Sequence, residues 1–198
     1  MIITIHRICD DIVFENHRFC ERSFKDLWKR SKVMDRKETT EFLGKLLKKE
    51  KFSGMGKYWA SEVSIDYGTT DVKRVDFMQF EPIGVCGISA IEKGSFTCYE
   101  IKSCKADFKS GFGQNFIAEK NYLVMPMKTY KEIIQEIPQG VGVLVPIPVY
   151  ADKYEEFESP TELSIDKEWK LCSIRKYIPK LRKRSMTELL FCMLRSGH

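Results

Sequence analysis

The chain has 198 residues, of which 43% are apolar and 31% charged, and its formal net charge is +5 at pH 7. This length suits one domain with a single core, and the composition excludes wholesale disorder. The longest apolar run, residues 141–151, is far shorter than the roughly 20 residues of a membrane span. Residues 1–14 lack the apolar stretch of a secretory signal peptide, so we expect a cytoplasmic protein with no membrane partner.

Helical spacing of apolar residues is clearest between residues 38 and 51. Phe42, Leu43, Leu46 and Leu47 repeat there with the period of an amphipathic helix. Less regular patterns predict further helices around residues 20–33, 114–119 and 128–137. A C-terminal helix is expected to begin at the capping box that Ser185 and Glu188 form.

Strands are indicated by alternating apolar and polar residues and by aromatic and β-branched runs. They are expected at residues 59–67, 72–80, 95–103, 121–126 and 141–149. The short turn at residues 68–71 makes the first two strands antiparallel neighbours. The element order predicts an α/β fold with a mixed β-sheet flanked by helices. We expect one domain over residues 1–198, with a core at about 38–149 and helical extensions at both ends, the C-terminal one basic and helical over about 167–198.

Basic residues concentrate in two parts of the chain. Residues 18–51 hold twelve Lys or Arg and six acids, and residues 167–184 hold eight bases and one acid. Such segments contact an anionic partner such as nucleic acid, or they are the solvated faces of two helices. The charge pattern alone leaves both interpretations open.

Several common kinds of site are disfavoured by the sequence. The seven cysteines include no C-x-x-C pair and the chain has three histidines, so a structural zinc site is not expected. The segment Gly54-x-Gly56-Lys57 is followed by Tyr58 instead of Ser or Thr, so it does not match a phosphate-binding loop.

The most informative residues lie in two predicted strands. Asp76 stands among apolar residues, and Glu100 and Lys102 are two apart, so they project from one face of their strand. Burying such charges is costly unless they pair or bind a metal ion. Two converging carboxylates can hold a divalent cation, and a lysine beside it can assist a water molecule. A plain Glu100–Lys102 ion pair on a half-exposed strand is the alternative. The other Glu-x-Lys match, Glu168 to Lys170, lies outside any predicted strand.

This arrangement resembles the PD-(D/E)XK nuclease superfamily. The resemblance rests on a helix with an acid, a strand with Val75-Asp76, a strand with Glu100-Ile-Lys102, and then a helix and a strand. Residues 99–108 are similar to the E-x-K-x-S-x-x-D-F run of MmcB-like DNA-repair nucleases. The resemblance covers about residues 38–149 and implies a restriction-endonuclease-like core. It does not account for Gly111 and Gly113.

The resemblance implies a magnesium site, at which Mn²⁺ can substitute. Asp76 and Glu100 would be ligands, together with the carbonyl oxygen of Ile101. The superfamily often adds an acid from the first core helix, a place that Glu41 matches. Glu62, at the start of the first strand, is its rival.

The resemblance also implies roles for polar residues around the metal. Lys102 would be the catalytic lysine, and Gln114 would match a polar residue that many members carry on the following helix. The expected activity is metal-dependent hydrolysis of phosphodiester bonds in a nucleic acid, with DNA as the expected substrate. Basic residues after the motif and in the C-terminal tract are expected to contact phosphates, namely Lys105, Lys109, Arg182, Lys183 and Arg184. The alternative is a domain that kept the fold and binds nucleic acid or protein without turnover.

Overall fold

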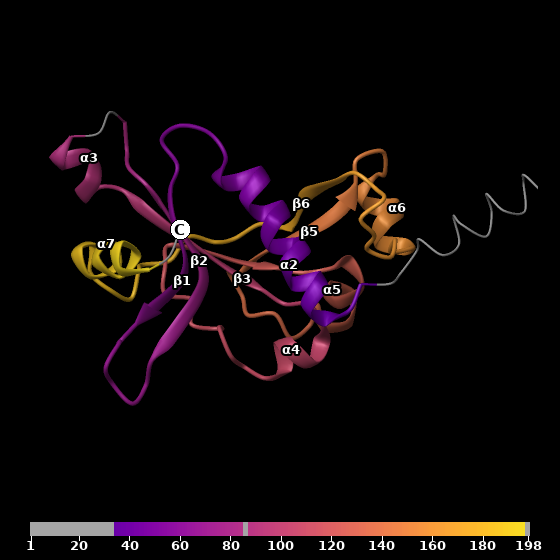
Figure 1. Ribbon diagram of the computed structural model, residues 1–198, viewed down its shortest axis with the longest axis horizontal. Helices are drawn as coiled ribbons and strands as arrows, with labels where there is room; N and C mark the ends of the chain where they lie inside the picture. Colours follow the sequence, from indigo (N-terminus) through magenta and orange to yellow (C-terminus); the bar gives the residue numbers. More distant parts are fainter. Residues whose placement is uncertain (1–33, 85–86, 197–198) are drawn as a thin grey trace, which may run out of the picture.

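The computed structural model describes residues 34–84 and 87–196, which form a six-stranded sheet with helices on both faces (Figure 1). The strands lie side by side in chain order, from β1 to β6. The predicted α/β class with a mixed sheet flanked by helices is therefore confirmed. The helix predicted around residues 20–33, and with it the N-terminal extension, lies outside the described residues.

The sheet combines antiparallel and parallel pairs. Strands β1, β2 and β3 form an antiparallel meander, β4 and β5 continue it in parallel, and β6 is antiparallel to β5. Their bounds are Tyr58–Ile65 (β1), Lys73–Glu81 (β2), Ser95–Ile101 (β3), Lys120–Val124 (β4), Gly142–Pro148 (β5) and Trp169–Arg175 (β6).

Strand β6 corrects the expectation of a helical tract from residue 167 onward. Trp169–Arg175 pairs with the free edge of β5, from Pro148↔Trp169 to Val143↔Arg175. An unpaired strand edge offers a row of backbone donors and acceptors, and this tertiary pairing outweighs the local pattern of charge. The Glu-x-Lys match at Glu168 and Lys170 therefore lies at the start of a strand, whereas no strand was expected there.

The helices are short apart from two. Their bounds are Arg36–Leu47 (α2), which continues as the π-helical turn Lys48–Phe52 (η1), Ile88–Glu92 (α3), Lys105–Lys109 (α4), Met127–Ile133 (α5), Lys153–Glu158 (α6) and Met186–Arg195 (α7). Helix α7 begins at the predicted cap, where the Ser185 side chain accepts from the Glu188 amide.

The helix predicted at residues 114–119 is wrong, because that segment is irregular and α4 precedes it. Gly113 and Phe116 have φ angles of +71° and +44°. A right-handed helix cannot include such residues. The segment instead forms an irregular loop with turns, and at Gly113 its backbone comes close to Glu100 of β3.

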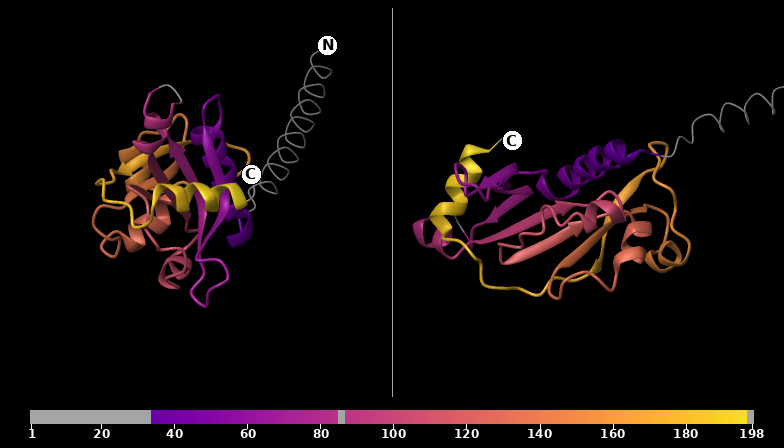
Figure 2. Two further views of the ribbon diagram at one scale, coloured as in Figure 1. Left: turned by 90° about the vertical axis from the view of Figure 1, so that its left-hand side faces the viewer. Right: turned by 90° about the horizontal axis from the view of Figure 1, so that it is seen from below.

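Helix α2 covers one face of the sheet, and α4, α5 and α7 pack on the other. In Figure 2, α7 is seen across the end of the sheet at which β1 and β2 lie. Leu43 and Leu47 of α2 pack on Phe77, Tyr99 and Ile101. On the opposite face, α7 packs over β1 to β3, while α5 packs over β4 and β5. Within the described ranges, no helix is long and apolar enough to cross a bilayer.

Candidate metal centre

Two carboxylates meet on the face of the sheet that α4, α5 and α7 cover. Strands β2 and β3 pair up to Phe77↔Tyr99, and the next position along each strand is Asp76 and Glu100. Asp76 Oδ2 accepts a hydrogen bond of 2.8 Å from the Ile101 amide. The side chain thereby takes the place of a main-chain partner, which fixes its carboxylate beside that of Glu100.

Glu100 is enclosed by the protein. Its side chain is 2% exposed, and Oε2 is the one fully buried side-chain oxygen or nitrogen in the described part of the chain that lacks a hydrogen-bond partner. Leaving a buried acceptor unpaired costs on the order of 1–3 kcal/mol, and more if it is charged. A cation bound between the two carboxylates would remove this cost.

The electrostatics of the pair favour an added positive charge. Burial, followed by the nearby carboxylate of Asp76, raises the pKa of Glu100 to about 9. Burial also raises the pKa of Asp76, against the opposing effects of the Ile101 amide, Lys102 and Arg74. Ionising both groups is costly unless a cation lies between them, and without a cation the pair tends to retain a proton.

Lys102 lies on the same face as Glu100 and is 4% exposed. Its backbone amide continues the pairing to β4 through a 2.9 Å hydrogen bond to the Val124 carbonyl. Its Nζ donates to the carbonyl oxygen of Phe112, 2.6 Å away. The structure therefore brings Asp76, Glu100 and Lys102 together, as the sequence predicted, and ties the lysine to the loop that follows α4.

Gly113 is a part of the centre that sequence reasoning missed. A Cβ at this position would overlap Glu100 Oε2 and lie 3.3 Å from Lys102 Nζ. Its φ of +71° is also unfavourable for other residues. The glycine lets the backbone of the loop close directly over the carboxylate and the ammonium. The neighbouring Gly111 has the same kind of φ, +74°, but a Cβ there would meet no atom within 4 Å.

Neither candidate for a further acid reaches the pair. Glu41 is exposed on α2, which covers the other face of the sheet. Glu62, with a φ of +53°, forms a 2.8 Å ion pair with Arg74 and is 59% exposed. No group of three or more His, Cys, Asp or Glu that could hold a metal ion occurs among residues 34–84 and 87–196. The centre therefore offers two carboxylates, with the Ile101 carbonyl as the remaining expected ligand.

Residues just after Lys102 fasten the centre to its surroundings. Asp107 Oδ2 accepts from the Ser103 amide and hydroxyl at 3.0 and 3.1 Å, and Oδ1 pairs with Arg36 of α2 at 3.0 Å. Gln114 donates from Nε2 to the Phe108 carbonyl, 2.6 Å away. Its amide thus holds the loop against α4. Asp107 could be singled out from the sequence because it occupies the D position of the E-x-K-x-S-x-x-D-F run. Its ion-pair partner on α2, Arg36, could not be predicted from the sequence.

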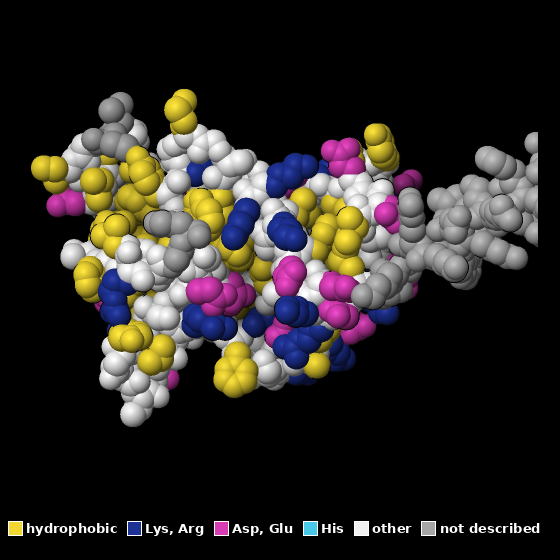
Figure 3. Space-filling view, in the orientation of Figure 1, with side chains coloured by type: hydrophobic (Ala, Val, Ile, Leu, Met, Phe, Trp, Pro, Cys, Tyr) yellow, Lys and Arg dark blue, Asp and Glu magenta, His cyan; other side chains and the backbone are white. Residues whose placement is uncertain are grey.

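Most residues expected to contact phosphates have partners within the protein. Arg182 pairs with Glu119 and Arg184 with Asp66, each at 2.6 Å. Lys183 donates to the Asn115 carbonyl at 3.1 Å, and Lys109 pairs with Glu136. Lys105 is exposed. Basic and acidic side chains are intermixed on the face seen in Figure 3. The C-terminal bases therefore fasten the coil before α7 to the body of the domain.

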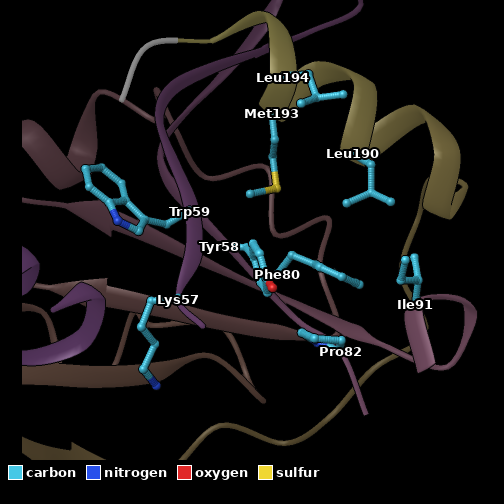
Figure 4. Close-up of a pocket in the computed structure, with 9 residues that line it drawn as sticks. All are labelled: Lys57, Tyr58, Trp59, Phe80, Pro82, Ile91, Leu190, Met193 and Leu194. Carbon is cyan, nitrogen blue, oxygen red and sulfur yellow. The ribbon is translucent and has the colours of Figure 1, made fainter. Parts of the chain in front are cut away.

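An apolar cavity of about 610 Å³ lies away from this centre, between α7 and the ends of β1 and β2 (Figure 4). Leu190 and Met193 of α7 point into it towards Phe80 and Ile91. It contains none of the carboxylates discussed above. The carboxylate pair, not this apolar cavity, is the place with the chemistry of a site.

No protein-family model, curated protein sequence or solved structure matches this chain. The family resemblance seen in the sequence therefore stays a prediction, and any function has to be inferred from the geometry of the centre.

Replacing Glu100 with glutamine should change how stability depends on pH. The folded-state pKa of about 9 lies above the ordinary value of 4.5, so the folded protein binds more protons than the unfolded chain between these values. The free energy of unfolding should then fall as pH rises from about 4.5 to 9, by up to about 1.4 kcal/mol per pH unit. Glu100→Gln should flatten this decline and be more stable than wild type at pH 8 in metal-free buffer.

Denaturant unfolding at pH 5, 6.5 and 8 measures this difference. Glu41→Gln, at an exposed acid on α2, is the matched control and should follow the wild-type profile. Parallel profiles for wild type and Glu100→Gln would contradict the assignment of Glu100 as a buried carboxyl of raised pKa.

Substitution of the two loop glycines separates backbone strain from damage to the centre. Gly113→Ala and Gly111→Ala each place an alanine at positive φ, which costs roughly 1–2 kcal/mol. Only Gly113→Ala displaces the Glu100 carboxylate. We expect both variants to lose similar backbone stability, whereas Gly113→Ala alone should lose any thermal stabilisation by Mg²⁺ or Mn²⁺. Equal metal responses in the two variants would show that the loop does not shape the centre.

Proposed function

We propose that the protein is a metal-dependent nuclease that hydrolyses phosphodiester bonds of DNA, with Mg²⁺ as its cofactor and Mn²⁺ as a substitute. The observation that carries this proposal is the pair of the part-buried Asp76 and the buried Glu100, with Lys102 on the same face. The Oε2 atom of Glu100 lacks a hydrogen-bond partner. Hard oxygen ligands in this number suit magnesium, which keeps several waters in protein sites. The described cysteines are free, in keeping with a cytoplasmic location.

The donor set fits the metal that the family resemblance implies. Asp76, Glu100 and the Ile101 carbonyl would hold it. The Oε2 atom of Glu100 has no hydrogen-bond partner, so a bound cation would compensate its negative charge. When bound, the ion would offset charge on the phosphate and acidify a coordinated water. The order of α2, the antiparallel meander β1–β3 and the parallel strand β4 agrees with the PD-(D/E)XK arrangement, and this supports the proposal.

Lys102 has the position of a group that acts on the water and the phosphate. Its ammonium donates a hydrogen bond to the Phe112 carbonyl. Both this ammonium and the Glu100 carboxylate lie next to Gly113. An ammonium fixed before the reaction can orient an attacking water and stabilise negative charge that develops on the phosphate. Because an ammonium cannot be a metal ligand, its contribution should be to the chemical step and not to metal binding.

Lys102→Met tests this division of roles. The methionine keeps most of the buried stem but removes the charge, so we expect cleavage to fall by at least about 10²-fold, as when a group that stabilises the transition state is removed. Metal-dependent thermal stabilisation and DNA binding should persist. Lys102→Ala should give the same loss of cleavage, whereas Asp76→Ala and Glu100→Ala should lose the metal response as well. Plasmid nicking and calorimetric metal titration are the measurements.

Lys37→Met, at an exposed residue of α2, is the control and should cleave as wild type does. Equal cleavage by wild type and Lys102→Met would point to a contaminating nuclease or another active site. Wild-type protein that binds no metal and is inert on single-stranded, duplex and branched DNA and on RNA would instead favour the alternative, an inactive nucleic-acid-binding or protein-interaction domain on the same fold.

The salt dependence of DNA binding should identify the residues that touch phosphate. Removing one basic side chain that touches phosphate should reduce the slope of log affinity against log salt by about 0.9. Lys105 is exposed beside the centre, so Lys105→Gln should reduce the slope by about this amount. Arg182→Gln and Arg184→Gln break ion pairs within the protein, so they should lower stability while leaving the slope nearly unchanged. Fluorescence anisotropy at several salt concentrations checks this, and an unchanged slope for Lys105→Gln would remove Lys105 from the interface.

A further inference from the structure

A polar cavity lies on the α2 face of the sheet. Helix α2 and the turn η1 cover this face only as far as Phe52, under which Phe77 and Tyr99 pack. Beyond η1, the same face presents a row of paired polar residues, in which Gln79 on β2 lies opposite Thr97 on β3. The cavity, of about 370 Å³, opens over this row. It is lined by Glu50, Lys51, Lys57, Gln79, Glu81, Thr97, Tyr99, Lys120, Tyr122 and Tyr177.

The floor of this cavity contains polar groups without partners. Gln79 and Thr97 are each 2% exposed. Gln79 Oε1 accepts from the Tyr99 hydroxyl at 3.2 Å, but the Gln79 amide nitrogen and the Thr97 hydroxyl form no hydrogen bond to any described residue. A sheet face that only had to pack would carry apolar residues here. A donor and a hydroxyl left open to a cavity are groups that a ligand can satisfy.

The charges at the rim favour an anionic ligand. Lys120 is neutralised by Glu81, 2.5 Å away. Lys51 and Lys57 form no ion pair in the described ranges, and Glu50 is the other acid of the lining. Lys57 borders the apolar cavity as well, and in Figure 4 its side chain points away from α7.

We propose that this cavity binds a single nucleotide. The phosphate would lie against Lys51 and Lys57, and the edge of the base would bond to the Gln79 amide and the Thr97 hydroxyl. Amide and hydroxyl side chains read base edges in this way, and ammonium groups hold phosphate as point charges. The volume is at the low end for small-ligand pockets, which limits the occupant to one nucleotide.

This site is separate from the candidate metal centre and does not rest on the proposed nuclease activity. Successive residues of a strand project to opposite faces, so Thr97 and Tyr99 face away from Glu100. The nucleotide is either free in solution or part of a nucleic-acid strand. No glycine-rich loop is involved, because the donors are side chains of β2, β3, η1 and the segment just before β1.

Calorimetric titration of the full-length protein in buffer with a chelator tests the site without any contribution from metal-dependent catalysis. The probes are AMP, dAMP, UMP, inorganic phosphate and a short single-stranded oligonucleotide. Gln79→Leu and Thr97→Val keep the volume of the floor while removing its polar groups, and Lys57→Met removes a rim charge. Thr39→Val and Lys37→Met, at a buried threonine and an exposed lysine of α2, are matched controls.

We expect wild type to bind at least one nucleotide, and Gln79→Leu and Thr97→Val each to weaken binding tenfold or more. Lys57→Met should weaken binding and reduce its salt dependence, while both controls should stay within twofold of wild type. Binding of free nucleotides supports a small-molecule site. Binding of the oligonucleotide alone, with the same sensitivity to Gln79→Leu and Thr97→Val, supports a nucleotide held within a strand.

Three results would overturn the proposal. One is the absence of binding by every probe at millimolar concentration. Another is nucleotide binding that neither Thr97→Val nor Gln79→Leu weakens. The third is inorganic phosphate binding as tightly as the nucleotides, which would reduce the site to a charge attraction. Circular dichroism verifies that each variant folds. If Gln79→Leu does not fold, the nearly isosteric Thr97→Val variant alone tests whether nucleotide binding depends on the polar floor of the cavity.

Discussion

The pairing of the part-buried Asp76 with the buried Glu100 is the interaction on which the rest of the site depends. Asp76 replaces a backbone partner of Ile101, and Glu100 keeps an oxygen enclosed without any partner. A domain of this size has only about 5–15 kcal/mol of net stability, so it retains such a cost only where the surroundings hold it in place. Gly113 closes over Glu100, and the Phe112 carbonyl holds Lys102 beside it. These neighbours keep the charges concentrated where a cation would relieve them.

The pleat of β3 places residues of the candidate metal centre and of the proposed nucleotide cavity on opposite faces of one strand. Glu100 faces the side covered by α4, α5 and α7, whereas Tyr99 faces α2. Apolar contacts under α2 end at Phe52, so the same strand changes from core packing at Ile101 to a polar cavity floor at Thr97. The limited length of α2 and η1 thus leaves part of the sheet free for a ligand, while the opposite face holds the carboxylates.

Several basic residues in the described part of the chain act within the fold. Arg36 joins α2 to Asp107 behind the centre, and Arg182 and Arg184 fasten the C-terminal coil to Glu119 and Asp66. The two C-terminal pairs are half-buried, where charge pairing is less screened than at the surface. A basic tract in a sequence therefore gives little indication of a nucleic-acid surface until the positions of the acids are known.

The sequence by itself determined the α/β class and the grouping of Asp76, Glu100 and Lys102, because the two-residue period of a strand fixes which side chains share a face. It did not determine β6, whose pairing partner is the edge of β5, or the irregular path of residues 110–119. It also gave two candidates for a further acid, Glu41 and Glu62, and neither reaches the pair. Spacing along a strand is a local property that the residues encode directly. The approach of Gly113 to Glu100, the pairing of Arg182 with Glu119 and the end of α2 over the sheet join segments far apart in the chain, and only the tertiary packing decides them.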